Sequence, residues 1–103
     1  MSISTHVLDA TTGRPAVGVA VRLSGLDGAP LDEGHTDSDG RCAIAPYDLE
    51  PGTYELTFDS SGYFAERTFY PSVTVTFSVQ DGGAHHHVPL LLSPHSYTTY
   101  RGS

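Results

Sequence analysis

Short stretches of alternating apolar and polar residues, separated by turn-forming residues, run through almost the whole chain. Residues 3–8, 53–58 and 73–79 follow the two-residue period of a β-strand, whose successive side chains point to opposite faces. Eleven glycines and seven prolines are spread between such stretches and supply the turns that join them. No stretch keeps the 3.6-residue period of an amphipathic helix for long. The pattern predicts an all-β fold, an antiparallel β-sandwich of seven to eight strands with one short helix.

The expected elements account for the sequence from end to end. We expect strands at residues 3–8, 19–24, 41–45, 53–58, 73–79, 85–92 and 96–101. Asp81-Gly82-Gly83 is expected to turn the chain between two of them. Residues 60–67 are predicted to form one helix of about two turns, with Ser60 or Ser61 as its N-cap. No linker or repeat divides the sequence, so residues 1–103 are predicted to form a single β-sandwich domain.

The acidic charge of the chain excludes several kinds of partner. Twelve acidic residues against five basic ones give a formal charge of −7, and such a field repels phosphate backbones and anionic lipids. We therefore expect no nucleic-acid partner and no membrane partner. No apolar run approaches the roughly 20 residues that span a bilayer, and residues 1–6 lack the basic and apolar regions of a secretory signal. A cytoplasmic protein is expected, and its single Cys42 rules out an internal disulfide.

Residues 88–92 (Val-Pro-Leu-Leu-Leu) are apolar on both faces of their predicted strand. A sandwich strand with one face in water should alternate instead, so the outer face needs a cover. Nothing else in so short a chain is expected to be available for this, and a second copy of the chain is the simplest cover. We therefore predict an oligomer; the alternative is an unusually apolar edge strand.

Six histidines in so short a chain are a second anomaly, and strand alternation places two of them on one side with an arginine. When the apolar neighbours of His6, Arg41 and His87 face the core, all three of these side chains point outward. Imidazole titrates near neutral pH and can activate water as a general base, which contributes about 10²–10⁴ in rate. The planar donors of Arg41 are suited to an anionic or urea-like ring, or to an oxyanion that develops on a carbonyl.

Other interpretations of these residues stay open on spacing alone. Taken singly, each strand histidine is also consistent with a solvated side chain, and Arg41 with a solvated residue after a turn. Zinc is an alternative at residues 85–87, but only His85 and His87 share a face, and a third ligand such as His6 has to come from elsewhere. Asp37-Ser38-Asp39-Gly40 resembles the start of a calcium loop but lacks the distal glutamate, so we expect a simple turn.

Three segments together resemble the transthyretin-related 5-hydroxyisourate hydrolases. They are Ser4-Thr5-His6-Val7-Leu8-Asp9 with Gly13-Arg14-Pro15-Ala16, Thr36-Asp37-Ser38-Asp39-Gly40-Arg41, and His87-Val88-Pro89-Leu90-Leu91-Leu92-Ser93-Pro94. The chain ends in Tyr100-Arg101-Gly102-Ser103, the most specific part of the resemblance, because it separates these hydrolases from the thyroid-hormone carrier transthyretin. The resemblance spans essentially the full chain.

The resemblance implies a fold, an assembly and a reaction. It implies a transthyretin-like (prealbumin-like) β-sandwich that forms a homotetramer, with active sites in a channel at the dimer–dimer interface. The catalytic residues that the resemblance implies are His6, Arg41 and His87. It also implies a substrate pocket completed by Tyr100, Arg101, Gly102 and Ser103, with Ser103 nearest the substrate. The implied reaction is hydrolysis of 5-hydroxyisourate to 2-oxo-4-hydroxy-4-carboxy-5-ureidoimidazoline, a step between urate and allantoin. It needs no metal and no organic cofactor.

Two positions depart from the family pattern, and two other functions compete. The family often has tyrosine at the position of His86, and tyrosine or another residue at that of His95. We expect His86 to point away from His87 and to have little effect on the chemistry, whereas His95 tunes the local pH dependence. The competing functions are a transthyretin-like carrier of a small aromatic ligand and a purely structural prealbumin-like module, neither of which needs the histidines and the C-terminal sequence.

Overall fold

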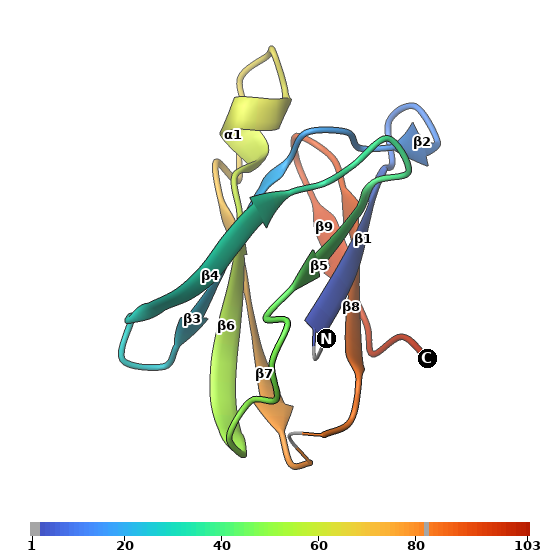
Figure 1. The fold of residues 1–103 in the computed structure, drawn as a ribbon. Helices are drawn as coiled ribbons and strands as arrows, with labels where there is room; N and C mark the ends of the chain where they lie inside the picture. The colour runs from blue at the N-terminus through green and yellow to red at the C-terminus, as the bar shows by residue number, and fades with distance from the viewer. Residues whose placement is uncertain (1–2, 82) are drawn as a thin grey trace.

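The alternating stretches become strands of two facing β-sheets in the computed structural model, which describes residues 3–81 and 83–103 (Figure 1). Residue 82 of the expected turn Asp81-Gly82-Gly83 lies outside the described residues. So do residues 1 and 2 of the N-terminal segment that was used to predict the location of the protein. The elements, in chain order, are β1 (Ile3–Asp9), β2 (Arg14–Pro15), β3 (Ala20–Gly25), β4 (Pro30–His35), β5 (Arg41–Ile44), β6 (Gly52–Phe58), α1 (Ser60–Tyr63), β7 (Val73–Val79), β8 (His86–Leu92) and β9 (Tyr97–Thr99).

The first sheet has the order β2-β1-β8-β9, and β5 also pairs with β1. Strand β8 follows one edge of β1 along its whole length, so β2 and β5 share the other edge. The second sheet has the order β4-β3-β6-β7. Side chains from the inner faces of both sheets form the core, as the alternation predicted. The largest fully buried ones include Ile3, Val7, Leu23, Ile44, Leu56, Phe58, Leu90 and Leu92.

The sandwich prediction is confirmed, but its strand count and pairing need correction. The described residues form nine strands rather than seven or eight. The segment Arg14–Pro15, outside the expected strands, pairs with the end of β1, and the polar segment Pro30–His35 forms an edge strand beside β3. Strands β1 and β8 are parallel, whereas every other strand pair is antiparallel. Parallel pairing joins segments far apart in the chain, which local alternation cannot reveal.

The predicted helix is shorter than expected and is capped by a different residue. Helix α1 ends at Tyr63, and the next residue, Phe64, is already extended (φ −80°, ψ 133°). The N-cap is Asp59, whose side chain accepts a hydrogen bond from the backbone N–H of Gly62. The hydroxyl of Tyr63, the last residue of the helix, donates to Asp9 on β1, at 2.9 Å. Among the described residues, no helix is long and apolar enough to cross a membrane.

The outer face of β8 is covered in part by the chain itself. Leu90 and Leu92 face the core, while Pro89 and Leu91 point outward, as alternation predicted. Pro89 is nevertheless buried, because the segment after β9 passes over it at Gly102. The expectation that nothing in this chain is available to cover the strand is therefore wrong for Pro89. Leu91 remains partly exposed.

Candidate active site

His6 and Arg41 lie directly opposite each other on neighbouring strands of the first sheet. The antiparallel register of β1 and β5 pairs these two residues. Directly opposite residues of an antiparallel pair have Cβ atoms about 4.5–5.5 Å apart and lie on the same face. That face is the outer one, since the preceding and following residues of β1, Thr5 and Val7, are fully buried. His6 is half-buried and Arg41 is exposed, so the pair forms a cationic, solvent-accessible site.

A tight turn before β5 sets the position of Arg41. One carboxylate oxygen of Asp37 accepts hydrogen bonds from the backbone N–H groups of Asp39 (2.8 Å) and Arg41 (3.0 Å). These hydrogen bonds, together with the nearby charges of Arg41 and His6, lower the pKa of Asp37. Gly40 completes the turn with a positive φ of 75°, and its carbonyl accepts the N–H of Val7 at 2.8 Å. The Asp37–Gly40 segment is thus a turn, and it fixes Arg41 opposite β1.

Replacing Gly40 with alanine is expected to destabilise the protein more than the same replacement at a left-handed glycine with open space around it. A Cβ atom at Gly40 would lie 2.5 Å from the carbonyl oxygen of Val7, within the β1 backbone. Strain at a left-handed residue costs about 1–3 kcal/mol, and the clash adds to it, so we expect the Tm to fall by roughly 10 °C or more. Circular dichroism melting measures this. Gly13→Ala is the matched control, since Gly13 has the same sign of φ (73°) but nothing within 4 Å of its Cβ position; equal melting temperatures would contradict the prediction.

His87 reaches the same outer face from β8. The parallel register pairs His87 with Ser4, two residues before His6 on β1, so the three side chains share one face. The Ser4 hydroxyl lies 2.7 Å from Nδ1 of His87 and 2.7 Å from Nε2 of His85. Burial lowers the pKa of His87, and the charges of Arg41, His85 and His6 lower it further, against a smaller opposing effect of a hydrogen bond with the backbone of Ser4. His87 is therefore neutral over a wider pH range than an ordinary histidine.

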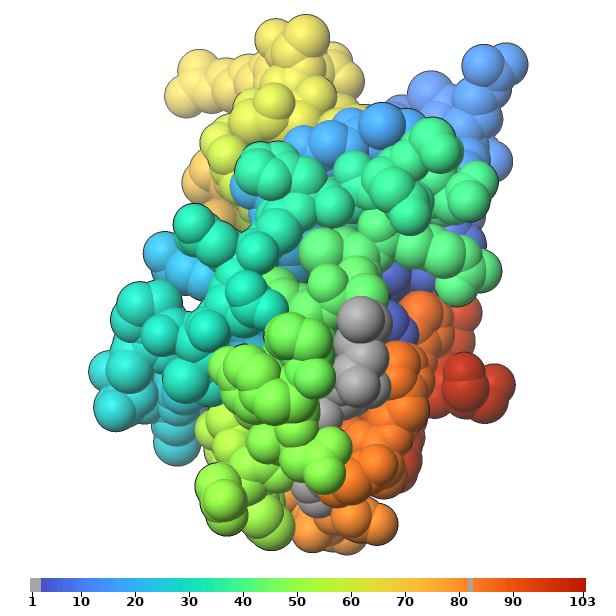
Figure 2. Space-filling view, viewed as in Figure 1, coloured from blue at the N-terminus to red at the C-terminus, as the bar shows by residue number. Residues whose placement is uncertain are grey.

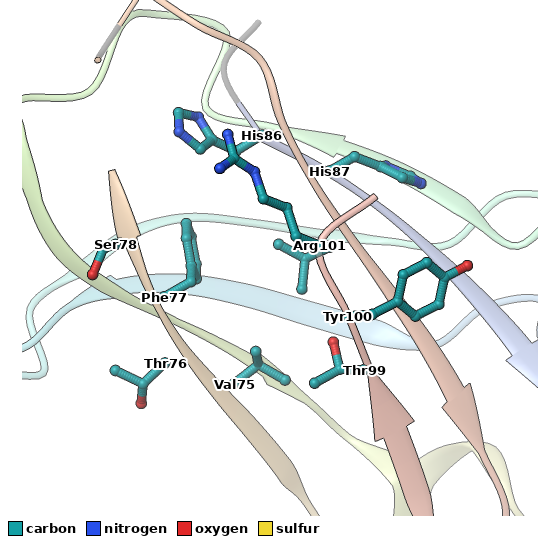
Figure 3. Close-up of a pocket in the computed structure, with 10 residues that line it drawn as sticks. Val75, Thr76, Phe77, Ser78, His86, His87, Thr99, Tyr100 and Arg101 are labelled. Carbon is teal, nitrogen blue, oxygen red and sulfur yellow. The ribbon is translucent and has the colours of Figure 1, made fainter. Parts of the chain in front are cut away.

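The C-terminal segment runs across His87. The backbone N–H of Gly102 donates to the carbonyl of His87 at 2.9 Å, and the two residues form an isolated antiparallel bridge. Tyr100 and Arg101 line a cavity of about 300 Å³ together with His86 and His87. Figure 3 shows Tyr100 on the side of His87 and Arg101 on the side of His86. Ser103 is exposed at the end of this segment, which projects beside β8 in Figure 2.

Gly102→Ala is expected to disturb His87 without unfolding the sandwich. A Cβ atom at Gly102 would lie 2.5 Å from Cδ2 of His87 and 3.0 Å from Cγ of Pro89, so either the imidazole or the C-terminal segment must move. A displacement of this size in a positioned group lowers kcat by about 10–100-fold, while the Tm should stay within a few degrees because the segment is at the surface. The control is Gly83→Ala, whose added Cβ would lie at an ordinary van der Waals distance of 3.5 Å from Oδ1 of Asp81. Equal activity of the two variants would show that close contact with His87 is not required.

The candidate residues fall into two groups that share His87. His6 and Arg41 occupy the open outer face, and neither lines the cavity that borders His87. That cavity lies between the β7 and β8–β9 edges of the two sheets, with Val75 and Phe77 on its far side. A single chain therefore leaves the outer-face group open to solvent.

The remaining histidines are placed as follows. His86 is buried and points away from His87, as expected, with its Nδ1 3.0 Å from the carbonyl of Ala84. His95 is exposed near Arg67, Thr68 and Phe69. Among residues 3–81 and 83–103, no three His, Cys, Asp or Glu side chains gather closely enough to hold a metal ion. A zinc site at residues 85–87 thus finds no third ligand within this part of the chain.

Sequence reasoning missed the contact of Ser4 with both His85 and His87. The signal was present, because Ser4 lies two residues before His6 and His85 two residues before His87, which puts each on the outer face. What alternation cannot give is the parallel register of β1 and β8, which brings these residues together.

Taken together, fold and site define a small β-sandwich protein with a polar histidine–arginine site on its outer face. The HIUase/Transthyretin family model matches residues 3–102, and the chain belongs to this family. It is 47% identical to the 5-hydroxyisourate hydrolase of Mus musculus, over 98% of this chain and 94% of that one. The structure of Klebsiella pneumoniae 5-hydroxyisourate hydrolase superposes with a TM-score of 0.90 at 36% identity, covering 100% of both chains. Transthyretin from Sparus aurata superposes with a TM-score of 0.87 at 32% identity, over 97% of this chain and 95% of that one.

Proposed function

We propose that this chain is a 5-hydroxyisourate hydrolase. The observation that carries the proposal is the cross-strand pair of His6 and Arg41 with His87 beside it on one outer face, in a chain with full-length similarity to such hydrolases. A cation and two imidazoles provide a base for water and a partner for a negatively charged oxygen. A carrier of an apolar ligand has no need of this combination.

In the proposed reaction a water molecule opens the substrate ring. His87, assisted by His6, takes a proton from water as its oxygen bonds to the ring carbonyl carbon. Arg41 binds the substrate and stabilises the negative charge that develops on the carbonyl oxygen. When the C–N bond breaks, the imidazolium returns the proton to the leaving nitrogen. The product is 2-oxo-4-hydroxy-4-carboxy-5-ureidoimidazoline, and the residues supply the chemistry without a metal or organic cofactor.

The C-terminal residues are proposed to complete the substrate pocket. Tyr100 lies on the side of His87, Arg101 lines the same cavity on the side of His86, and Gly102 lies against the His87 imidazole. Ser103 then extends toward the substrate. The absence of a side chain at Gly102 supports this role, because it lets the segment approach His87 closely.

We further infer that the working unit is a homotetramer with sites at its dimer–dimer interface. Support comes from the open outer face, where Arg41 is exposed and Leu91 is only partly covered by its own chain. Hydrolytic sites gain from exclusion of bulk water, which strengthens every electrostatic contact within them. A second copy over this face would provide that enclosure. The cytoplasmic location stays a prediction.

The deciding experiment follows the ultraviolet decay of 5-hydroxyisourate generated in place by urate oxidase. The chain is added together with a metal chelator, and the spontaneous rate is measured in parallel. Decay that is much faster than the spontaneous rate, and unaffected by the chelator, is the expected result. An unchanged rate would reject the hydrolase and favour a carrier, of the kind suggested by the similar transthyretin from sea bream crystallised with thyroxine.

The pH dependence of the reaction should reflect the environment of His87. Burial and the charges of Arg41, His85 and His6 lower its pKa below the ordinary value of 6.5. A base with a lowered pKa stays unprotonated down to a lower pH. As the pH is lowered, the fall in kcat/KM should therefore have its midpoint below pH 6.5. Rates between about pH 4.5 and 8, corrected for spontaneous decay at each pH, measure this. A midpoint above 7 would show that His87 does not act as the base.

A further inference from the structure

The Ser4 hydroxyl is placed between two imidazoles. Its oxygen lies 2.7 Å from Nε2 of His85 and 2.7 Å from Nδ1 of His87. These are short distances for hydrogen bonds to nitrogen. A hydroxyl has one proton, so it can donate to at most one of these nitrogens, and when it does so it accepts from the other. The three groups therefore form a directional chain with two possible proton arrangements.

The two arrangements give His87 different chemistry. In the first, Nδ1–H of His87 donates to Ser4, Ser4 donates to Nε2 of His85, and Nε2 of His87 is left with a free lone pair. In the second, every hydrogen bond is reversed, and Nε2 of His87 carries the proton. Only the first arrangement allows His87 to act as a base toward water, since a neutral imidazole has one basic nitrogen.

We propose that Ser4 is a positioning residue that, together with His85, holds His87 in the base-competent tautomer and carries a proton away from it during hydrolysis. This inference rests on the proposed function. As Nε2 of His87 takes a proton from water, Nδ1–H passes to Ser4 Oγ, and the hydroxyl proton passes to Nε2 of His85. Ser4 and His87 end neutral, His85 becomes an imidazolium, and the water oxygen attacks as hydroxide. The return of the three protons accompanies C–N cleavage.

The surroundings of the two histidines favour placing the charge on His85. His87 is half-buried, and the Arg41 charge acts on it directly, so a cation there is disfavoured. His85 is exposed, and water solvates a cation at its ring. The relay therefore moves positive charge from the sheltered imidazole to the solvated one.

Ser4→Ala tests the proposal, with Ser4→Thr as the conservative variant and Thr53→Ala as the control. Thr53 is an exposed strand residue on the second sheet, so its loss removes a hydroxyl far from the site. We expect Ser4→Ala to lower kcat by about 10–100-fold with little change in KM. Ser4→Thr, which keeps a hydroxyl on a half-buried strand position, should stay within about threefold of the wild type.

The second readout is the ¹⁵N spectrum of the histidine side chains at pH 8, with His87 assigned from the spectrum of His87→Gln. Nδ1 of His87 should be protonated in the wild type and in Ser4→Thr, and this preference should be lost in Ser4→Ala. In His85→Ala the hydroxyl is free to donate to Nδ1, so His87 should shift toward the opposite tautomer.

An unchanged His87 tautomer in Ser4→Ala, or a kcat within twofold of the wild type, would overturn the proposal. Failure of the proposed function would be detected by a separate measurement, the rate of substrate decay with the wild-type chain. If the wild-type chain leaves substrate decay at its spontaneous rate, the hydrolase is rejected, while the ¹⁵N spectra still decide whether Ser4 fixes the tautomer.

Discussion

Replacing His87 with alanine is expected to lower the rate of catalysed 5-hydroxyisourate decay by about 10²–10⁴-fold, or about 3–5 kcal/mol of transition-state stabilisation. The reason is the loss of the imidazole that we propose activates water, at a position where a lowered pKa favours its neutral form. The loss should fall mainly on kcat, because proton transfer is made in the transition state and not in the substrate complex. Ultraviolet progress curves at several substrate concentrations separate kcat from KM.

The sandwich should survive this change, since His87 lies on the outer face of its sheet. His35→Ala is the matched control, because His35 is an exposed strand histidine on the opposite sheet. Its activity and Tm should both equal those of the wild type. Near-normal activity of His87→Ala would remove this residue from the mechanism and leave His6 as the candidate base.

Replacing Arg41 with alanine should be the second most damaging change, lowering kcat/KM by about 10²–10³-fold. Arg41 supplies the positive charge and the fork of donors opposite His6, and alanine has neither. Arg41→Lys keeps the charge but not the fork, so we expect it to recover about tenfold of the loss. Burial is the main cause of the lowered pKa of His87, and the charge of Arg41 is the next. Removing that charge should raise the pKa of His87, so the acid limb of kcat/KM in Arg41→Ala should also move to higher pH.

Arg22→Ala serves as the control for this series. Arg22 is an exposed arginine on a strand of the second sheet, so its removal changes the net charge by the same amount without touching the site. If Arg22→Ala and Arg41→Ala lost equal activity, the effect would be one of overall charge. If Arg41→Lys were as active as the wild type, the planar fork would have no role.

Much of this site could be predicted from side-chain alternation alone. The outward placement of His6, Arg41 and His87 needs only a two-residue period and a knowledge of which neighbours are apolar. The turn that positions Arg41 was equally visible, because aspartate and glycine favour it for known reasons. These are local properties, and local sequence determines them.

The parts that escaped prediction depend on contacts between distant segments. The parallel pairing of β1 with β8 fixes Ser4 beside His87, 83 residues away. The passage of Gly102 over Pro89 is likewise decided by where β9 ends. The hydrogen bond from Tyr63 to Asp9 likewise joins residues far apart in the chain. No window of the sequence contains both partners of these contacts.

The parallel pairing of β1 with β8 also determines when the site can form during synthesis. Ser4 and His6 are synthesised before their partner strand, which follows them by about 80 residues. Closing a loop of roughly 80 residues costs chain entropy before the contact forms, and such non-local pairing is slow. The first sheet and the active site should therefore form together, only after β8 has been synthesised.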